Sequence, residues 1–267
     1  MERLEPLHQE LGKPGPSDWL AVHPEPGQTF EEYRRSNPVR PRGRRATVYV
    51  QPIGEFSSRQ REVVDVTAEF TAVFYDVPTR TSLAIPLSEI PARARRRHPA
   101  TGTPQLLTTY ILRELLAPRL PEDAAAYVAF TAEDLWPGEG WNFVFGQAAL
   151  RERVGVWSIH RNGDPEKGDE AFRLCLLRTM KTAAHELGHM FSMAHCTAYR
   201  CGMNGSNTLE EKDRRPLAFC PDCMAKVCWA TGADPLERCR RLAEFCRDAG
   251  LREQADRYAE FARVLAD

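Results

Sequence analysis

The sequence lacks the features that direct a chain out of the cell or into a membrane. Its first residues contain no apolar signal-peptide core, and no run among the 267 residues is apolar enough to span a bilayer. Cysteine is absent before Cys175, and seven of the eight cysteines fall between Cys196 and Cys246. We therefore expect a cytoplasmic protein without a membrane partner, whose cysteines bind metal instead of forming disulfides.

The chain also has almost no net charge. Its 36 Lys and Arg residues oppose 37 Asp and Glu residues, which leaves −1 at pH 7. This balance favours neither nucleic acid nor an acidic membrane surface as a partner, so we expect no nucleic acid. Two local basic runs are either solvated loops or phosphate-binding segments: Arg40, Arg42, Arg44 and Arg45, and Arg93, Arg95, Arg96 and Arg97.

Three parts are predicted along the chain. Residues 1–43 hold seven of the twenty prolines and little apolar periodicity. This N-terminal extension either packs on the protein through Trp19, Phe30 and Tyr33 or lacks fixed structure. Residues 44–232 form the main domain. Residues 233–267 form a C-terminal helical hairpin, because Asp234-Pro235 is a strong helix start and Gly250 a strong stop.

The main domain mixes strands and helices. Apolar patterning predicts strands at 46–53, 83–87, 126–131, 141–147 and 154–159, and helices at 57–74, 104–116 and from about 169 into residue 185. Residues 70–77 fit either a helix end or a strand. The short gap at 148–153 predicts that the last two strands form an antiparallel hairpin. The order predicts an α/β or α+β fold with helices on one face of the sheet.

The residues most indicative of chemistry begin at His185. The segment His185-Glu186-Leu187-Gly188-His189 places two imidazoles one turn apart on one helix face, where both can bind one Zn²⁺. Glu186 lies beside them and is placed to take a proton from water at the metal. On a straight helix, His195 would lie about 9 Å along the axis from His189, so the helix must end and turn back. Three imidazoles then leave one zinc position open, which is the catalytic arrangement.

A second metal site is predicted directly after the first. Cys196-x4-Cys201 and Cys220-x2-Cys223 are two thiolate pairs with eighteen residues between them. Four thiolates complete a tetrahedral Zn²⁺ and leave no open position, so this zinc would be structural. The alternative is a set of buried cysteines without metal. Cys175, Cys239 and Cys246 lie on apolar helical stripes and are expected in the core, while Cys228 is a spare that can replace a ligand.

From His185 to Cys223 the sequence resembles the archaemetzincin family of zinc metallopeptidases. The similar segments are HELGHMFSMAHC, Cys201-Gly-Met203 and Cys220-Pro-Asp-Cys223, with a weaker likeness over about residues 45–230. The resemblance implies a metzincin-like α+β fold. It would have a mixed twisted sheet with an antiparallel edge strand, an active-site helix below the sheet and an embedded zinc-knuckle subdomain.

The resemblance also implies roles for particular residues. His185, His189 and His195 would bind the catalytic zinc, and Glu186 would act as general base and acid. Cys196, Cys201, Cys220 and Cys223 would hold the structural zinc, so the chain would carry two Zn²⁺. Met203 would form the Met-turn, an apolar floor beneath the histidines. Residues 143–148 would be the edge strand that binds a peptide or protein substrate, with aminopeptidase-like action.

Ser192 departs from the family pattern, which has glycine three residues after the second histidine. Glycine there turns the backbone with a positive φ, and serine in that conformation costs about 1–2 kcal/mol. We predict that Ser192 nevertheless has a positive φ.

Two other functions remain open from the sequence. The chain can be a non-catalytic, zinc-stabilised binding module, although an intact Glu186 favours an enzyme. It can also be a SprT-like, DNA-associated protease, although Cys196 directly after His195 does not fit that arrangement. Asn204, Ser206 and Asn207 either line the substrate cleft or form a polar turn. The sequence does not predict the oligomeric state.

Overall fold

The computed structural model describes all 267 residues, which group into two compact units. One unit, the sheet unit, comprises Pro41–Ala72 and Val77–Glu186. The other, the cysteine unit, comprises Met1–Arg40, Val73–Asp76 and Leu187–Asp267. The unit boundary falls inside two continuous helices, α3 (Ser58–Tyr75) and α5 (Asp169–Met190). The three-part division expected from the sequence remains a prediction.

The sheet unit is organised around five strands. They are β1 (Thr47–Ile53), β2 (Thr79–Thr81), β5 (Ala124–Thr131), β7 (Gly146–Ala149) and β8 (Val154–Ser158), in the order β2-β1-β5-β8-β7. All neighbours are parallel except β7, which runs antiparallel to β8 at the sheet edge. The predicted mixed sheet with an antiparallel edge strand is confirmed.

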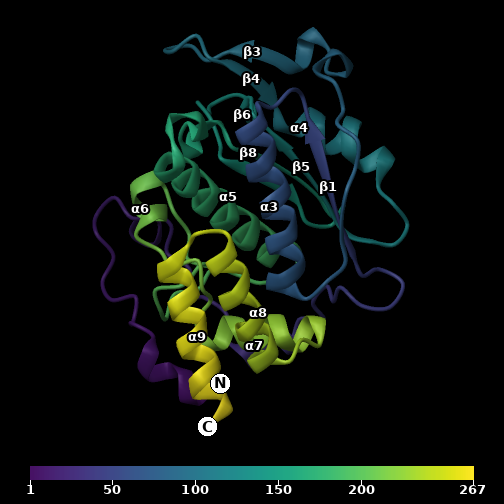
Figure 1. The fold of residues 1–267 in the computed structure, drawn as a ribbon. Helices are drawn as coiled ribbons and strands as arrows, with labels where there is room; N and C mark the ends of the chain where they lie inside the picture. The colour runs from purple at the N-terminus through teal and green to yellow at the C-terminus, as the bar shows by residue number, and fades with distance from the viewer. The chain divides into compact units, whose positions relative to one another are not determined.

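Helices cover both faces of this sheet, so the expectation of helices on one face is wrong. Helices α3 and α5 lie over one face (Figure 1). On the other, side chains such as Tyr127 and Val156 pack against α4 (Thr108–Tyr110) and the π-helix that follows it directly, η4 (Ile111–Leu116). Every residue of β5 and β8 is buried, which agrees with strands covered on two sides.

Several short elements differ from the sequence predictions. No strand forms at 83–87, where Ile85 makes only an isolated bridge to Ile53, because the next residue, Pro86, has no backbone N–H with which to extend the ladder. The predicted helix at 104–116 begins only at Thr108, because Pro104–Leu107 is strand β4 and pairs with β6 (Asp134–Trp136). The strand predicted at 141–147 is displaced to β7, and residues 70–75 are helical.

The basic run at 93–97 is not a solvated loop. It includes β3 (Arg95–Arg97), which pairs with β4, and the Arg96 guanidinium lies 4.5 Å from the ring centroid of Trp136. The remaining elements of this unit are short 3₁₀ helices: η2 (Leu87–Glu89), η3 (Ala92–Ala94), η5 (Ala117–Arg119), η6 (His160–Asn162) and η7 (Pro165–Lys167).

The cysteine unit is helical. Its elements are η1 (Glu2–Leu7), α1 (Trp19–Val22), α2 (Phe30–Arg35), α6 (Leu209–Asp213), α7 (Pro221–Thr231), α8 (Pro235–Asp248) and α9 (Arg252–Ala266). Helices α8 and α9 lie side by side as a hairpin (Figure 1), as the sequence predicts. Asp234 caps α8 by accepting a hydrogen bond from Glu237 N at 2.8 Å, and Gly250 turns the chain with φ 72°.

The N-terminal residues are packed. Leu4 and Tyr33 are fully buried, and Thr29 and Glu32 form a capping box at the start of α2. Of the two expectations for this segment, packing is the one the structure bears out.

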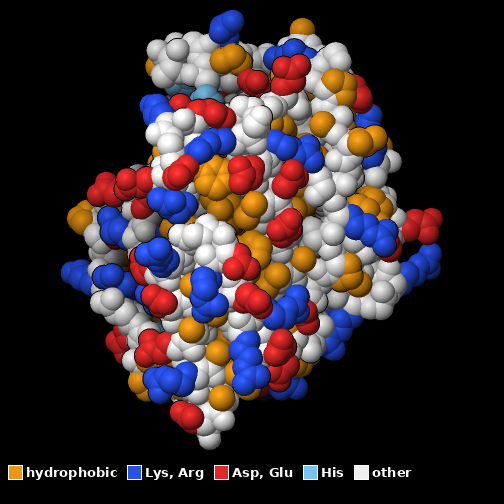
Figure 2. Space-filling model, in the orientation of Figure 1, with side chains coloured by type: hydrophobic (Ala, Val, Ile, Leu, Met, Phe, Trp, Pro, Cys, Tyr) orange, Lys and Arg blue, Asp and Glu red, His pale blue; other side chains and the backbone are white.

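The surface mixes charges of both signs. On the face drawn in Figure 2, basic and acidic side chains are interspersed, and neither sign gathers into a single patch. No helix combines the length and apolar character needed to cross a bilayer.

Candidate metal centres

Helix α5 ends in a hydrogen-bonded turn that sends the chain back toward the helix. Ser192 N donates to His189 O at 2.8 Å, and Met193 N donates to Gly188 O at 2.9 Å. These two bonds form a Schellman motif, whose turning residue is usually glycine. Ser192 occupies that position with φ 71°, so the prediction of a positive φ is confirmed. Its hydroxyl accepts a hydrogen bond from Val39 N at 3.1 Å, which helps to offset the backbone strain.

The turn brings the three predicted histidines together. His185 and His189 lie one turn apart on α5, and His195 follows the Schellman motif. One ring nitrogen from each of the three lies within 4.8 Å of the others. All three side chains are half-buried, and the rings of His189 and His195 have centroids 4.7 Å apart. Three imidazoles at this spacing can hold one metal ion and leave a coordination position for another ligand.

Hydrogen bonds at Nδ1 orient two of these rings. His189 Nδ1 lies 2.7 Å from Met193 O, and His195 Nδ1 lies 2.7 Å from Glu25 Oε2. A carbonyl or carboxylate oxygen only accepts, so each Nδ1 carries the hydrogen and each Nε2 keeps its lone pair for a metal. Burial lowers the pKa of His195 below its ordinary value, and the neighbouring His189 lowers it further. Both effects favour the neutral imidazole that binds metal.

Glu186 and Met203 complete the surroundings of the histidines. Glu186 is half-buried and follows His185 on α5. Met203 is fully buried, and a Cβ built at Gly188 would lie 2.5 Å from its Sδ. The methionine thioether therefore packs against the helix between the two histidine positions. Gly188 permits that close contact because it has no side chain.

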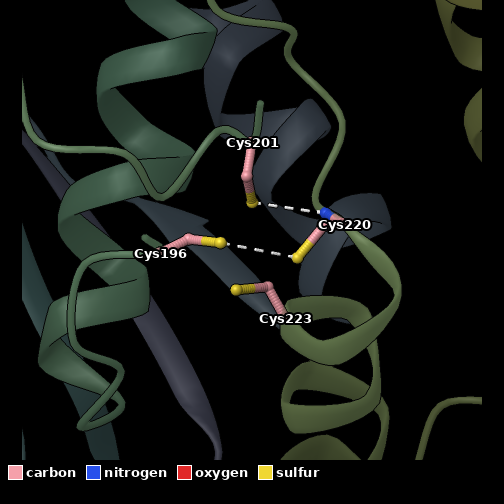
Figure 3. A group of neighbouring side chains, drawn as sticks. All are labelled: Cys196, Cys201, Cys220 and Cys223. Atoms are coloured by element: carbon pink, nitrogen blue, oxygen red, sulfur yellow. Dashed lines mark hydrogen bonds between the residues drawn. The ribbon is translucent and has the colours of Figure 1, made fainter. Parts of the chain in front are cut away.

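The four predicted cysteines also converge (Figure 3). Cys196 and Cys201 come from the loop after α5, whereas Cys220 and Cys223 come from the start of α7. Their sulfur atoms lie within 4.8 Å of one another, and the Cys196 and Cys220 sulfurs are 3.7 Å apart. Tetrahedral zinc with Zn–S bonds of about 2.3 Å requires sulfurs about 3.8 Å apart. The donor set therefore fits zinc.

The chemistry of the four thiols also fits a cation. Hydrogen bonds from the other three cysteines lower the pKa of Cys196, while burial raises the pKa of Cys201 well above its ordinary value. The pKa of Cys223 is raised by its hydrogen bonds with Cys196 and the other two cysteines. Four adjacent thiolates need a positive charge to ionise together, and a bound dication supplies it.

The other cysteines lie outside this cluster. None of the eight cysteines forms a disulfide, and Cys175, Cys228, Cys239 and Cys246 are buried. Burial raises the pKa of Cys239 to about 11 and that of Cys246 to about 12, so both remain thiols at neutral pH. Cys228 belongs to neither group of metal-competent residues.

Asn204, which the sequence predicts either in the substrate cleft or in a polar turn, has a more specific structural role. It is 5% exposed, and its side chain bonds to three backbone groups of the Cys196–Cys201 loop. Asn204 Oδ1 accepts from Cys201 N at 2.8 Å, and Nδ2 donates to the carbonyls of Cys196 and Tyr199 at 2.7 and 2.8 Å. It also lines a cavity of about 150 Å³ beside His195, which Ser206 and Asn207 do not line.

Replacing Asn204 by alanine is expected to lower the free energy of unfolding by about 3 kcal/mol, because three backbone groups lose their partner. Chemical denaturation measures this change. Ser206→Ala, two residues along, is the matched control and should stay within about 0.5 kcal/mol of the original chain. Equal stability of the two variants would contradict the structural role of Asn204.

Comparisons with known proteins identify relatives of this chain. A model of peptidase family M54 matches residues 126–228. The chain is 34% identical to human archaemetzincin-2 over 265 residues, covering 87% of this chain and 73% of that protein. The chain belongs to the archaemetzincin family.

Solved archaemetzincins share the fold. The Archaeoglobus fulgidus structure, complexed with malonate, matches with a TM-score of 0.53 and 28% identity, over 67% of this chain and 99% of that one. The Methanopyrus kandleri structure matches with a TM-score of 0.51 and 28% identity, over 68% of this chain and 93% of that one. The predicted metzincin-like fold is confirmed, and membership in this peptidase family makes the chain a zinc metallopeptidase.

Proposed function

We propose that this archaemetzincin hydrolyses peptide bonds with one catalytic zinc and carries a second, structural zinc. His185, His189 and His195 would hold the catalytic ion, and Glu186 would be the general base and acid. The observation that supports this most strongly is the convergence of three imidazoles, two of which have Nδ1 bonded to an oxygen acceptor and so present Nε2 as the metal-binding nitrogen.

The chemistry divides between the metal and the chain. Zinc, when bound, would supply a Lewis acid that makes water acidic near neutral pH. Glu186 would take the proton from the attacking water and deliver it to the departing amine. The histidines would fix the position of the reaction beside Glu186. Met203 would act as the Met-turn, an apolar floor that keeps α5 in place under the histidines.

Cys196, Cys201, Cys220 and Cys223 would hold the structural zinc. Four protein ligands leave no place for a substrate or water, so this zinc would have a structural role and no catalytic one. Because His195 and Cys196 are adjacent, an ion at the cysteine site would also anchor the backbone that presents His195.

The proposed substrate is a peptide or small protein with a free amino terminus. Strand β7 has one neighbour, β8, so its second edge is available for an extended peptide to pair as an added strand. Aminopeptidase-like action follows from the family resemblance. No nucleic-acid partner is part of the proposal.

A panel of peptides tests this function. We expect the zinc-loaded chain to cleave peptides with free amino termini, and to lose activity when treated with a chelator. Acetylating the amino terminus should lower kcat/KM at least tenfold if the enzyme removes terminal residues. Liquid chromatography with mass spectrometry of the products measures both points. Equal cleavage of acetylated and free peptides would identify an endopeptidase instead of an aminopeptidase. Absence of all cleavage with zinc bound would favour a binding module.

A further inference from the structure

We propose that the N-terminal segment Trp19–Val39 positions the third metal ligand, and that Glu25 is the positioning residue for His195. This rests on the proposed function in one respect, which is that His195 binds zinc. The segment belongs to the same compact unit as the turn that it contacts. Neither the sequence motifs nor the family resemblance assigns it a part in the site.

Glu25 makes the central contact. Its Oε2 lies 2.7 Å from His195 Nδ1, and its Oε1 accepts a hydrogen bond from Trp19 Nε1 at 2.8 Å. The side chains of Glu25 and His195 are only 28% and 16% exposed, so solvent competes little for this bond. Trp19 also meets the His195 ring edge-on, with centroids 5.4 Å apart. Both carboxylate oxygens are thus engaged, and the imidazole is held from two sides.

The rest of the segment fixes the backbone that leads to His195. Gln28 spans the turn, since its Oε1 accepts from Ala194 N at 3.1 Å and its Nε2 donates to Ser192 O at 3.3 Å. The fully buried Tyr33 donates from its hydroxyl to Phe191 O at 2.9 Å. Val39 N donates to Ser192 Oγ at 3.1 Å. Residues 191–195 form no helix or strand after α5, so these contacts take the place of regular structure.

The geometry explains how a turn without regular structure can present a metal ligand accurately. A histidine ligand needs both a fixed ring tautomer and a fixed ring orientation. The Glu25 carboxylate fixes the tautomer, because it leaves the hydrogen on Nδ1 and the lone pair on Nε2. Trp19 in turn fixes the carboxylate. Loss of such an outer partner lowers metal affinity by about 10–100-fold in other zinc proteins.

The test measures zinc affinity at the histidine site by competition with a chromophoric chelator, using the full chain. Glu25→Ala should weaken binding of one of the two zinc ions by about 10–100-fold and leave the other unchanged. Glu25→Gln keeps one acceptor oxygen for the two donors, His195 Nδ1 and Trp19 Nε1, so its loss of zinc affinity should be smaller. Trp19→Phe keeps an aromatic ring but removes the indole N–H, and it should weaken the same ion. Glu31→Ala, at an exposed glutamate paired with Arg34, is the matched control and should bind zinc normally.

The outcomes separate this inference from the proposed function. If Glu25→Ala folds and holds both ions as tightly as the original chain, Glu25 does not position His195, and the peptidase proposal is unaffected. If the original chain holds two ions but cleaves no peptide, the proposed function fails while the affinity result stands. If Glu25→Ala does not fold, Trp19→Phe decides, because normal zinc affinity in that variant overturns the inference. A kcat loss in Glu25→Ala that saturating zinc restores, with KM unchanged, is the supporting kinetic result.

Discussion

Glu186→Gln is expected to lower kcat for peptide hydrolysis by about 10²–10⁴-fold while both zinc ions remain bound. Glutamine has nearly the same size as glutamate but cannot accept and return a proton. Glu186 is not among the residues that gather into either metal-competent group, so its replacement should leave the ligand sets intact. The measurement pairs steady-state kinetics with elemental analysis of the same preparation.

The control for this experiment is Glu170→Gln, an exposed glutamate in the first turn of the same helix. That variant should have the activity of the original chain. Unchanged turnover in Glu186→Gln would exclude the assigned mechanism. A loss of zinc together with activity would instead assign Glu186 a role in holding the metal site.

Local sequence patterns predicted most of the fold and both clusters of metal-competent residues. Helix α5 carries its histidines at helical spacing, and the four cysteines are paired at short separations, so each pattern is readable within a few residues. Strand β5 and helix α8 are also predictable from the sequence, because apolar periodicity and capping residues act locally. The positive φ of Ser192 is predicted on another basis, which is the glycine that the family pattern has at this position.

Contacts between distant segments were not predictable from such patterns. Glu25 and His195 are 170 residues apart, and neither residue type nor spacing marks Glu25 as a partner. The sequence predicts a helix from residue 104 because the apolar residues of this stretch fit a helical period, whereas pairing with β6 makes Pro104–Leu107 a strand. Tertiary pairing overrides local preference in such short segments.

Removing one thiol from the cysteine cluster should have the largest effect on stability. Cys223→Ala is expected to lose one zinc ion and to unfold the cysteine unit at ordinary temperatures. Structural zinc contributes about 10–16 kcal/mol in small zinc domains, which equals or exceeds the 5–15 kcal/mol by which a typical domain is stable. The loop between Cys201 and Cys220 has only α6 as regular structure, and the zinc would be its link to Cys220 and Cys223 at the start of α7. Elemental analysis and thermal denaturation followed by circular dichroism measure the two effects.

Two further variants show which zinc ion is responsible. Cys228→Ala changes a buried cysteine on the same helix, α7, outside the cluster, and it should keep both ions with a loss of only about 1 kcal/mol. His195→Ala should also fall from two zinc ions to about one, but it should remain folded, because the cysteine site keeps all four ligands. The cysteine and histidine variants thus lose the same amount of metal with opposite consequences for stability. If Cys223→Ala kept two zinc ions and melted like Cys228→Ala, the four thiols would be ordinary core residues, and the structural site would have to be abandoned.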